Sequence, residues 1–562
     1  MAMAEQHYPV LIVGGGPVGL MLSCLLSRHG VQSLLVEQNE TTTDHPQAHV
    51  VNLRTMELFQ QLGIADAIYA ESLGPEWASN VRWVASMTGH EYAQIPTGPT
   101  EEQMISAAQL TPAIPASCPQ DRVEPVLLAK AQEGIGDVWY GTRFVSHRKL
   151  DKGVEAKLEK SGQELTVRAD WLVACDGAGS SVRRAEGIEM EGLGALAHIV
   201  GIYFHAELGE LLRDKSAILY FLVDEEESGI VITMDGGQRW VLHASWDEQR
   251  QSLDAFDEER CLTIVRRAIG ADVDIDIRSV KPWTMSAQVA ARYRSGSVLI
   301  AGDAAHRFPP TGGFGLNSGV QDSHNLAWKL AAVIQGKANE SLLDSYELER
   351  KPVGVSNCDF SARNAMGIGD VNGPGAKEKA RAIASGERDQ ADVAAEIQAI
   401  AERERAHFGA LGMDIGFSYE QGALIPDGTE PPHRENPELE YIPSGRPGGR
   451  APHAWVTIGG EFKSTLAVFE GSMTLLVDGD KEVWEHAAAN FPHDLRILSI
   501  GSDITGNDVS LAELYGLVGG AVLVRPDGHV AWRSRSPLED PGAVMARISH
   551  SILGIELAEE AA

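Results

Sequence analysis

Cysteine is scarce in this chain, and the few cysteines are widely scattered. Five occur in 562 residues, an odd number without close spacing. A disulfide-stabilised secreted domain or a structural zinc site needs paired or clustered cysteines, so we expect neither of these, and no metal. Free thiols fit a reducing compartment, which predicts a cytoplasmic protein. The five are Cys24, Cys118, Cys175, Cys261 and Cys358.

Long apolar runs and an excess of basic residues are also missing. Glycines and a proline interrupt the apolar stretch near the start of the chain, so we expect no signal peptide and no membrane span. Lysine and arginine number 47 against 79 aspartates and glutamates, a formal net charge of −32. Nucleic acids and anionic membranes are themselves densely negative, so this charge argues against both as partners.

The remaining composition is that of an ordinary globular protein. Hydrophobic residues make up 43% and charged residues 22% of the chain. A length of 562 residues exceeds what one hydrophobic core can organise, so we expect two to four domains.

A glycine-rich turn near the start of the chain has the setting of a dinucleotide site. Gly14–Gly19 follows the apolar run Val10–Val13 and precedes a helical pattern over Leu20–Arg28. A second strand, Ser33–Val36, ends at Glu37. Glycines let the backbone approach a pyrophosphate at the helix N-terminus, and the acid suits an unphosphorylated ribose. The alternative is a turn whose glycines serve only helix–sheet packing.

Two later motifs place an aspartate beside a glycine at the end of an apolar run. Asp176 follows Trp171–Ala174, and Asp303 follows Ser297–Ala301 before a glycine-rich loop and a helix beginning at Asn317. Such strand ends and helix N-termini can hold a long cofactor at several points. Together the three motifs favour a flavin. The alternative for each aspartate is that it merely caps a turn.

Changes in pattern along the chain predict an α/β protein with a Rossmann-like domain, an inserted sheet and a terminal α/β domain. Strand-like alternation outside the nucleotide fold indicates a second sheet domain inserted in the first. The expected domains are a discontinuous cofactor domain (1–75, 105–189, 285–375), a substrate domain (76–104, 190–284), a helical connector and loop (376–445) and a terminal domain (446–562).

The terminal segment has the pattern of a thioredoxin-like domain. Short strands are expected over Ser464–Phe469, Met473–Val477 and Leu495–Ile500, and a hairpin around Pro526-Asp527-Gly528. No cysteine occurs after Cys358, so dithiol chemistry is excluded and we expect a packing or assembly role.

The three motifs in this order resemble the single-component FAD-dependent aromatic hydroxylases typified by p-hydroxybenzoate hydroxylase. The residues that carry the resemblance are Gly14–Gly19 with Glu37, Cys175–Arg183, and Gly302–His306 through Gly315–Asn317. The terminal domain resembles the redox-inactive extension of the phenol and polyketide hydroxylase branch.

The resemblance implies a set of residues around FAD. The pyrophosphate would lie against Gly14, Gly16, Pro17 and Gly19. The adenosine ribose would lie at Glu37 and Gln38, and the following helix would add Gln120 and Arg122. The ribityl region would meet Gly302 and Asp303, and the ring would meet Thr311, Gly315, Leu316 and Asn317. Asp176 would serve both FAD and a transient NADH or NADPH, for which the chain has no second GxGxxG site.

The implied chemistry is attack by a flavin hydroperoxide, formed from O2, on a phenolic ring. A free phenol titrates near pH ~10 and an imidazole near ~6.5, so the base must be well placed. His49 is the candidate base, since Pro46–Asn52 resembles a Pro-Arg-x-His stretch of the phenol hydroxylase branch; the alternative is a histidine that only orders a loop. Gln47 replaces the usual arginine, and Arg54 either compensates or pairs with a phosphate.

Three further residues complete the expectation for the active site. Pro310 would face the catalytic space beside the ring, and Tyr220, on an alternating strand of the inserted sheet, is a candidate pocket residue. His306 is predicted to be structural.

The predicted function is hydroxylation of a small phenolic or polyketide-type aromatic substrate by a flavin monooxygenase. Within enzymes, the alternative is an epoxidase or Baeyer-Villiger-type catalyst on the same fold. From another class, the alternative is a flavin-binding interaction protein without catalysis. A homodimer is possible. The sequence does not select the substrate, the ring position, NADH over NADPH, or the oligomeric state.

Overall fold

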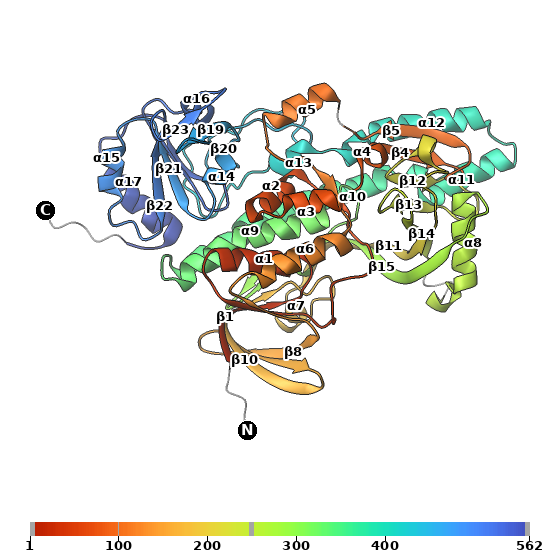
Figure 1. Ribbon diagram of the computed structural model, residues 1–562, viewed down its shortest axis with the longest axis horizontal. Coiled ribbons are helices and arrows are strands. Elements are labelled where there is room, and N and C mark those ends of the chain that lie inside the picture. Colours follow the sequence, from red (N-terminus) through yellow and green to blue (C-terminus); the bar gives the residue numbers. More distant parts are fainter. Residues whose placement is uncertain (1–5, 99, 247–251, 557–562) are drawn as a thin grey trace.

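The computed structural model describes residues 6–98, 100–246 and 252–556. Figure 1 shows a central lobe around helix α9 (Phe314–Ile334), a second lobe with its own large sheet, and a C-terminal lobe coloured blue. Among the helices of the described residues, none has the length and hydropathy to cross a membrane.

The sheet of the central lobe is built on five parallel strands. Their order is β17 (Val298–Ile300), β10 (Gln163–Ala174), β1 (Gln6–Val13), β2 (Ser33–Val36) and β7 (Asp137–Trp139). An antiparallel edge and a hairpin extend it: β16 (Arg294–Ser295), β8 (Thr142–Lys149) and β9 (Val154–Lys160). Strand β1 is central, and its apolar half, Val10–Val13, pairs with β2 on one side and β10 on the other. The carboxyl ends of β1, β10 and β17 therefore meet at one edge of the sheet.

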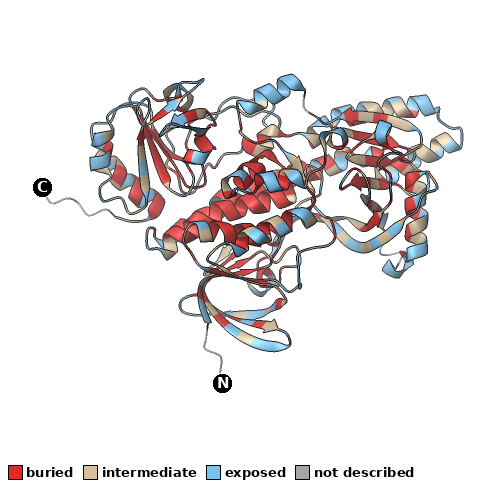
Figure 2. Ribbon diagram, viewed as in Figure 1, coloured by how far each residue is buried: buried red, intermediate tan, exposed pale blue. Residues whose placement is uncertain are grey.

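Helices cover this sheet close to that edge. Helix α1 (Pro17–Arg28) joins β1 to β2 and packs against both α9 and α6 (Gln120–Gln132). Helix α9 is buried over almost its whole length, as Figure 2 shows for the central lobe. Helix α10 (Asp344–Gly367) follows and packs against α9.

The second sheet has eight strands drawn from distant parts of the chain. Their order is β18 (His306–Arg307), β15 (Asp276–Ala290), β11 (Met190–His205), β14 (Arg239–Trp246), β13 (Gly229–Thr233), β12 (Leu219–Leu222), β4 (Asn80–Val84) and β5 (Glu91–Pro96). Helix α8 (Glu258–Ile269) packs on one face, where Trp240 and Leu242 are buried. On the other face, Trp83 and Phe221 pack against α11 (Gly373–Ala384) and α12 (Gln390–Arg403). The segment expected to be a connector thus begins with two helices that belong to the core of this lobe.

The C-terminal lobe contains a four-stranded sheet with helices. Its order is β22 (Leu495–Ser499), β21 (Met473–Val477), β24 (Ala521–Val524) and β25 (Val530–Ser534). Strands β21 and β22 are parallel and joined through α15 (Lys481–Ala487), whereas β24 and β25 form an antiparallel hairpin followed by α17 (Pro541–Ile548). A parallel βαβ unit followed by a hairpin and a helix is the arrangement of the thioredoxin fold.

A small sheet lies beside it, with the order β20 (Glu461–Ser464), β19 (Trp455–Ile458) and β23 (Ile504–Gly506). The strand predicted over Ser464–Phe469 is wrong. Ser464 ends β20, and its hydroxyl accepts a hydrogen bond from the amide of Leu466 and so caps the short helix α14 (Thr465–Val468).

Buried ionic groups join the C-terminal lobe to the central lobe. Arg525, on the β24–β25 turn, donates to both carboxylate oxygens of Glu349 on α10 at 2.7 and 2.8 Å, and it pairs with Asp527. Lys329 of α9 lies 2.7 Å from Glu349. The side chains of all four are at most 1% exposed, so two positive and two negative groups balance within one dry interface.

The remaining elements are short. They are β3 (Val50–Val51), β6 (Ala116–Ser117), α2 (Leu53–Leu62), α3 (Ala65–Ala70), α4 (Pro75–Ala78), α5 (Glu101–Ala108), α7 (Ser181–Ala185), α13 (Leu411–Ile415) and α16 (Leu511–Tyr515), with a 3-10 turn at Gly302–Ala304.

Candidate active site

The first glycine turn lies directly against the second motif. Gly14 has φ +111° and a side chain there would overlap the carbonyl oxygen of Cys175, next to Asp176. A side chain at Gly19 would overlap the carbonyl of Gly14, where the first turn of α1 crosses the loop. Only glycine fits both positions, because the backbone segments approach more closely than a Cβ atom allows.

The N-terminus of α1 is open to a ligand. Gly16 is its N-cap, Pro17 begins the helix, and within the described chain no side chain caps the first turn. A Cβ atom on Gly16 would have its nearest neighbour 3.9 Å away, at Glu124. Uncapped amides at the positive end of a helix suit a phosphate group.

Glu37 stabilises the glycine turn. Its Oε2 atom accepts the amide hydrogen of Gly15 at 2.8 Å, and its Oε1 atom accepts from the amide of Asn39 at 2.9 Å. The Tyr140 hydroxyl donates to the carbonyl of Gly15 at 2.7 Å. Tyr140 is a contributor that the sequence analysis missed, since a tyrosine at the end of a short strand gives no motif signal. Gln38, beside Glu37, is exposed.

Helix α6 brings two predicted cofactor residues to the same side. Gln120 donates through Nε2 to Glu124 at 2.7 Å, and Glu124 also accepts the amide hydrogen of Thr43 at 2.8 Å. Burial raises the pKa of Glu124 above its usual range. Arg122 is exposed and lies 3.7 Å from Glu71, so its guanidinium is held loosely.

Asp176 uses one carboxylate oxygen for the protein and has the other one available. Its Oδ2 atom accepts from the amide of Ser181 at 2.8 Å and from the amide of Val182 at 3.3 Å, which caps α7. Its Oδ1 atom is buried without a hydrogen-bond partner in the part of the chain that the structure describes. Capping of α7 therefore explains the Oδ2 atom of Asp176 but not the Oδ1 atom.

Asp303 lies at the edge of the same sheet. Its carboxyl is open to solvent, yet the surrounding protein desolvates it enough to raise its pKa. A side chain on Gly315, at the start of α9, would come 4.0 Å from Oδ1 of Asp303. An exposed carboxylate beside a helix N-terminus can accept hydrogen bonds from a polar ligand.

The loop that carries Asp303 is held by hydrogen bonds to Asp322 of α9. The amide of Gly302 donates to Asp322 at 3.1 Å, and His306 Nε2 lies 2.7 Å from the same carboxylate. His306, 1% exposed, therefore has a structural position. Side chains at Gly302 or Gly319 would collide with Val18 of α1, which shows how closely α1, α9 and this loop approach.

The N-terminus of α9 is the second uncapped helix end at this edge. Gly313, with φ +70°, is its N-cap, and among the described residues no side chain caps it. Thr311 donates through its hydroxyl to the carbonyl of Ser361 at 2.6 Å, while Pro310 is exposed. Leu316 is buried in the first turn.

Asn317 connects α9 to the segment of His49. Its side chain donates to the carbonyl of Val50 at 2.9 Å and accepts the amide hydrogen of Asn52 at 3.0 Å. Asn52 in turn donates through Nδ2 to Asp414 of α13 at 2.9 Å, and burial raises the pKa of Asp414 to about 7. The sequence analysis missed both Asn52 and Asp414, because their role depends on a helix more than 300 residues away.

His49 stands at the junction of the two large lobes. It precedes β3, which pairs with β6, and its Nδ1 atom lies 3.2 Å from the hydroxyl of Ser117. The ring is half-buried, and burial lowers the pKa of His49 to about 4. The imidazole is therefore neutral at pH 7 and able to accept a proton. Gln47 is exposed on the loop before it.

Two expected site residues lie elsewhere. Tyr220 is fully buried on the α8 face of the second sheet, where it packs near Trp240 and donates to the carbonyl of Lys215 at 2.8 Å. Arg54 is 2% exposed and donates to Glu57 at 2.8 Å and to the carbonyl of Asp527 at 2.8 Å. Tyr220 is thus a core residue, and Arg54 holds the C-terminal lobe rather than a cofactor.

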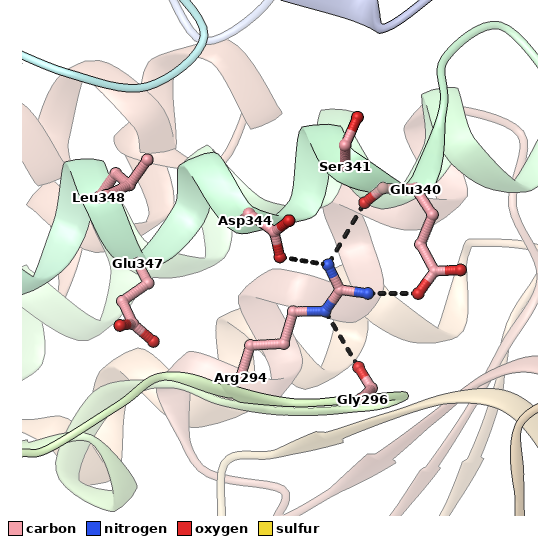
Figure 3. A pocket seen from close by; sticks show the side chains of 7 residues that line it. All are labelled: Arg294, Gly296, Glu340, Ser341, Asp344, Glu347 and Leu348. Carbon is pink, nitrogen blue, oxygen red and sulfur yellow. Dashed lines mark hydrogen bonds and ion pairs between the residues drawn. The ribbon is translucent and has the colours of Figure 1, made fainter.

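A surface hollow of about 550 Å³ beside Arg294 is separate from this edge (Figure 3). The guanidinium of Arg294 donates to Asp344 at 2.6 Å and pairs with Glu340, and Glu347 accepts the amide hydrogen of Tyr293 at 2.7 Å. The hollow adjoins the turn before β17, whereas Asp303 follows the other end of that strand.

The motif residues therefore form one extended site that fits FAD. Two uncapped helix ends, the unpartnered oxygen of Asp176 and the exposed Asp303 follow one edge of the sheet. This set offers positive helix ends to a pyrophosphate and polar groups to a ribityl chain. The edge ends near His49, because Asn317 of α9 binds the carbonyl of Val50.

Comparisons with known proteins agree with this geometry. Residues 7–361 match the family of the FAD binding domain, and residues 444–554 match the aromatic-ring hydroxylase C-terminal family. Tetracenomycin A2 monooxygenase-dioxygenase from Streptomyces glaucescens is 32% identical over 584 residues, which covers 98% of each chain.

Solved structures show the same fold over the whole chain. The flavin-dependent monooxygenase PieE, in complex with FAD and substrate, has a TM-score of 0.87 at 34% identity, covering 97% of this chain and 99% of PieE. A ternary complex of aklavinone-11 hydroxylase with FAD and aklavinone has a TM-score of 0.83 at 32% identity, covering 98% of this chain and 100% of that one.

Proposed function

Because the chain belongs to the FAD-dependent aromatic-ring hydroxylases, we propose that it hydroxylates a phenolic or polyketide-type aromatic compound with dioxygen and a nicotinamide nucleotide. Relatives named for tetracenomycin A2 and bound to aklavinone support an aromatic polyketide as substrate. The observation that carries the proposal is the row of open polar positions along one sheet edge, from the N-terminus of α1 to that of α9.

Different residues would bind different parts of FAD. The turn Gly14–Gly19 and the start of α1 hold the pyrophosphate, Glu37 the adenosine side, and Asp303 the ribityl chain. Leu316 and Asn317 reach the ring through their amides at the start of α9. Bound FAD supplies the redox chemistry by taking a hydride from the nicotinamide nucleotide and activating dioxygen. The unpartnered oxygen of Asp176 would contact FAD or that nucleotide.

Thr311, Gly315 and Pro310 form the wall beside the ring, whereas Gln120, Arg122 and Gln38 contribute from the adenosine side. These assignments are proposals, supported by the family resemblance and by the elements on which the residues lie. Residues 1–75, 105–189 and 285–375 would form the FAD domain. We add the helices α11 and α12 to the substrate domain of residues 76–104 and 190–284, because they pack on its sheet.

His49 would hold the phenolic hydroxyl of the substrate and act as its base. Complete proton transfer from a phenol of pKa ~10 to an imidazole of pKa about 4 is unfavourable by about 8 kcal/mol. His49 can therefore accept a hydrogen bond from the phenol, but it does not remove the proton unaided. Complete transfer requires further hydrogen-bond donors that stabilise the phenolate. Burial that excludes water serves the same end, because it strengthens each such hydrogen bond.

The setting of the enzyme follows from its chemistry. Free cysteines and a nicotinamide reductant support a cytoplasmic location, since reduced thiols persist there. A homodimer remains a prediction that light scattering of the purified protein tests.

The function is tested on the FAD-loaded protein with a panel of phenols and aromatic polyketides. We expect substrate-stimulated oxidation of NADH or NADPH, oxygen uptake and a product that gains one oxygen atom as a new phenol. A product identified by NMR as an ester or an epoxide would instead indicate Baeyer-Villiger or epoxidase chemistry. A yellow protein without turnover on any member would contradict catalysis and favour an interaction protein.

A further inference from the structure

One face of the second sheet carries a histidine whose ring makes no hydrogen bond within the described residues. His243 lies on β14 between Gly201 of β11 and Ile230 of β13. Its neighbours Trp240 and Leu242 are buried against α8. Side chains alternate along a strand, so His243 points to the opposite face. There its ring contacts Trp283, with the ring centroids 5.4 Å apart.

Gly201 leaves an open position next to this ring. A Cβ atom on Gly201 would lie 3.6 Å from Cδ2 of His243 and 3.7 Å from Nε2 of His45. The two imidazoles therefore lie close together on either side of Gly201, one from the second sheet and one from the loop that leads to His49. Ile230, which pairs with His243 across the strands, and Trp283, which contacts its ring, are half-buried apolar neighbours on the same face.

His49 lies close enough to His243 to act on it electrostatically. Burial, together with the nearby His45 and His49, lowers the pKa of His243 to about 4. His243 is thus neutral at pH 7, like His49, and offers one donor and one acceptor nitrogen.

The three rings differ in what they have available. His45 lies 2.7 Å from the hydroxyl of Ser279 through Nδ1, and His49 lies 3.2 Å from that of Ser117 through Nδ1. Each therefore commits one nitrogen to the protein, whereas both nitrogens of His243 are available. The ring is half-buried, and either of its unpartnered nitrogens can form a hydrogen bond with an oxygen atom of a ligand.

We propose that His243 binds a second oxygen substituent of the aromatic substrate, distinct from the hydroxyl held by His49. The enzyme then selects ring systems that carry hydroxyl or keto groups at two positions over simple monophenols. This inference rests on the proposed function, and it deepens that function by naming the class of substrate.

The test compares ligands that share one skeleton. The FAD-loaded full chain is titrated with 1-naphthol and with 1,5-, 1,6- and 1,8-dihydroxynaphthalene, and binding is followed by the change in flavin absorbance. We expect wild-type protein to bind at least one diol more tightly than 1-naphthol. His243→Phe keeps a ring of similar size but removes both nitrogens, and it should weaken that diol by roughly three- to tenfold while leaving 1-naphthol unchanged.

Two further variants keep the test specific. His243→Gln retains a donor and an acceptor and should restore the preference for the diol. His90→Phe changes an exposed histidine of the same lobe, whose ring contact is with Tyr92, and should behave as wild type. In turnover, His243→Phe should raise KM with kcat unchanged, whereas His49→Ala should lower kcat.

The possible failures are distinguishable. Equal binding of 1-naphthol and all diols by wild type, or no binding of any, overturns the inference, as does a His243→Phe protein that keeps the preference. If aromatic compounds are still oxygenated in any of these cases, the proposed function stands without the inference about His243. If no aromatic compound is oxygenated but the diol preference depends on His243, the proposed function fails and the binding role stands.

Discussion

Removing one charge from the dry interface between the central and C-terminal lobes should destabilise the protein severely. Glu349 accepts hydrogen bonds from Arg525 at 2.7 and 2.8 Å, Lys329 at 2.7 Å and Asn325 at 2.6 Å, and it is fully buried. Glu349→Gln keeps the shape but leaves a positive charge uncompensated in this interior. Breaking a buried pair in this way costs about 3–5 kcal/mol.

The pKa of the carboxyl supports the same magnitude. The cations beside it lower the pKa of Glu349 to about 2, against 4.5 for an ordinary glutamate. That difference corresponds to about 3 kcal/mol of stabilisation. Since the folded pKa is the lower one, the stabilisation is present above pH ~4.5 and is lost as the pH falls toward ~2.

The assay is thermal unfolding followed by circular dichroism at several pH values. For a cooperative unit of about 200 residues, we expect Glu349→Gln to lower Tm by roughly 10 °C at pH 7. The variant should also lose less stability than wild type between pH ~4.5 and the acid limit. Glu420→Gln is the matched control, because Glu420 pairs with Arg446 at the exposed surface, where such pairs contribute about 0–1 kcal/mol. A Glu349→Gln protein that melts within 2 °C of that control, taken as about 1 kcal/mol or less, would refute the reasoning.

Three further predictions concern the cofactor edge and the base. Asp303→Ala should weaken FAD retention by at least tenfold with the fold intact, measured by flavin content after gel filtration; stoichiometric FAD at wild-type affinity would contradict the assignment. Gly14→Ala should abolish FAD binding or folding, because its Cβ atom would overlap Cys175 at a φ of +111°. A folded variant that retains FAD as wild type does would show that the turn can accommodate a side chain. His49→Ala should lower kcat by about 10²–10⁴-fold with flavin content unchanged, and unchanged turnover across pH would eliminate it as base.

Much of the fold could be predicted because its signals are local. The α/β class, the Rossmann-like FAD domain and the FAD-dependent hydroxylase function are confirmed by the matching families and structures. A short stretch of about ten residues is enough to recognise a glycine required at a turn or an apolar run that ends in an acid. The edge formed by β1, β10 and β17 follows, because the carboxyl ends of parallel strands lie together.

Contacts between distant segments could not be predicted in this way. Tyr220 lies on an alternating strand, and alternation defines two faces without saying which is covered; α8, about 40 residues later, covers the face of Tyr220. Arg54 was predicted at the site but lies elsewhere, whereas His243 was not predicted at all. Arg54 follows a cofactor-like segment but contacts Asp527, whereas His243 belongs to no motif and lies across Gly201 from His45.

Helices α9 and α10 connect the loop of Asp303 to the C-terminal lobe through two adjacent buried ion pairs. Asp322 of α9 accepts the amide hydrogen of Gly302, next to Asp303, and also binds Arg350 of α10 at 2.8 Å. One position earlier on α10, Glu349 binds Arg525 of the C-terminal lobe. Neighbouring residues of one helix thus anchor the cofactor loop on one side and the terminal domain on the other. Because buried ionic groups tolerate little displacement without losing their partners, movement of the terminal domain would strain α10 and, through Arg350, the loop that carries Asp303.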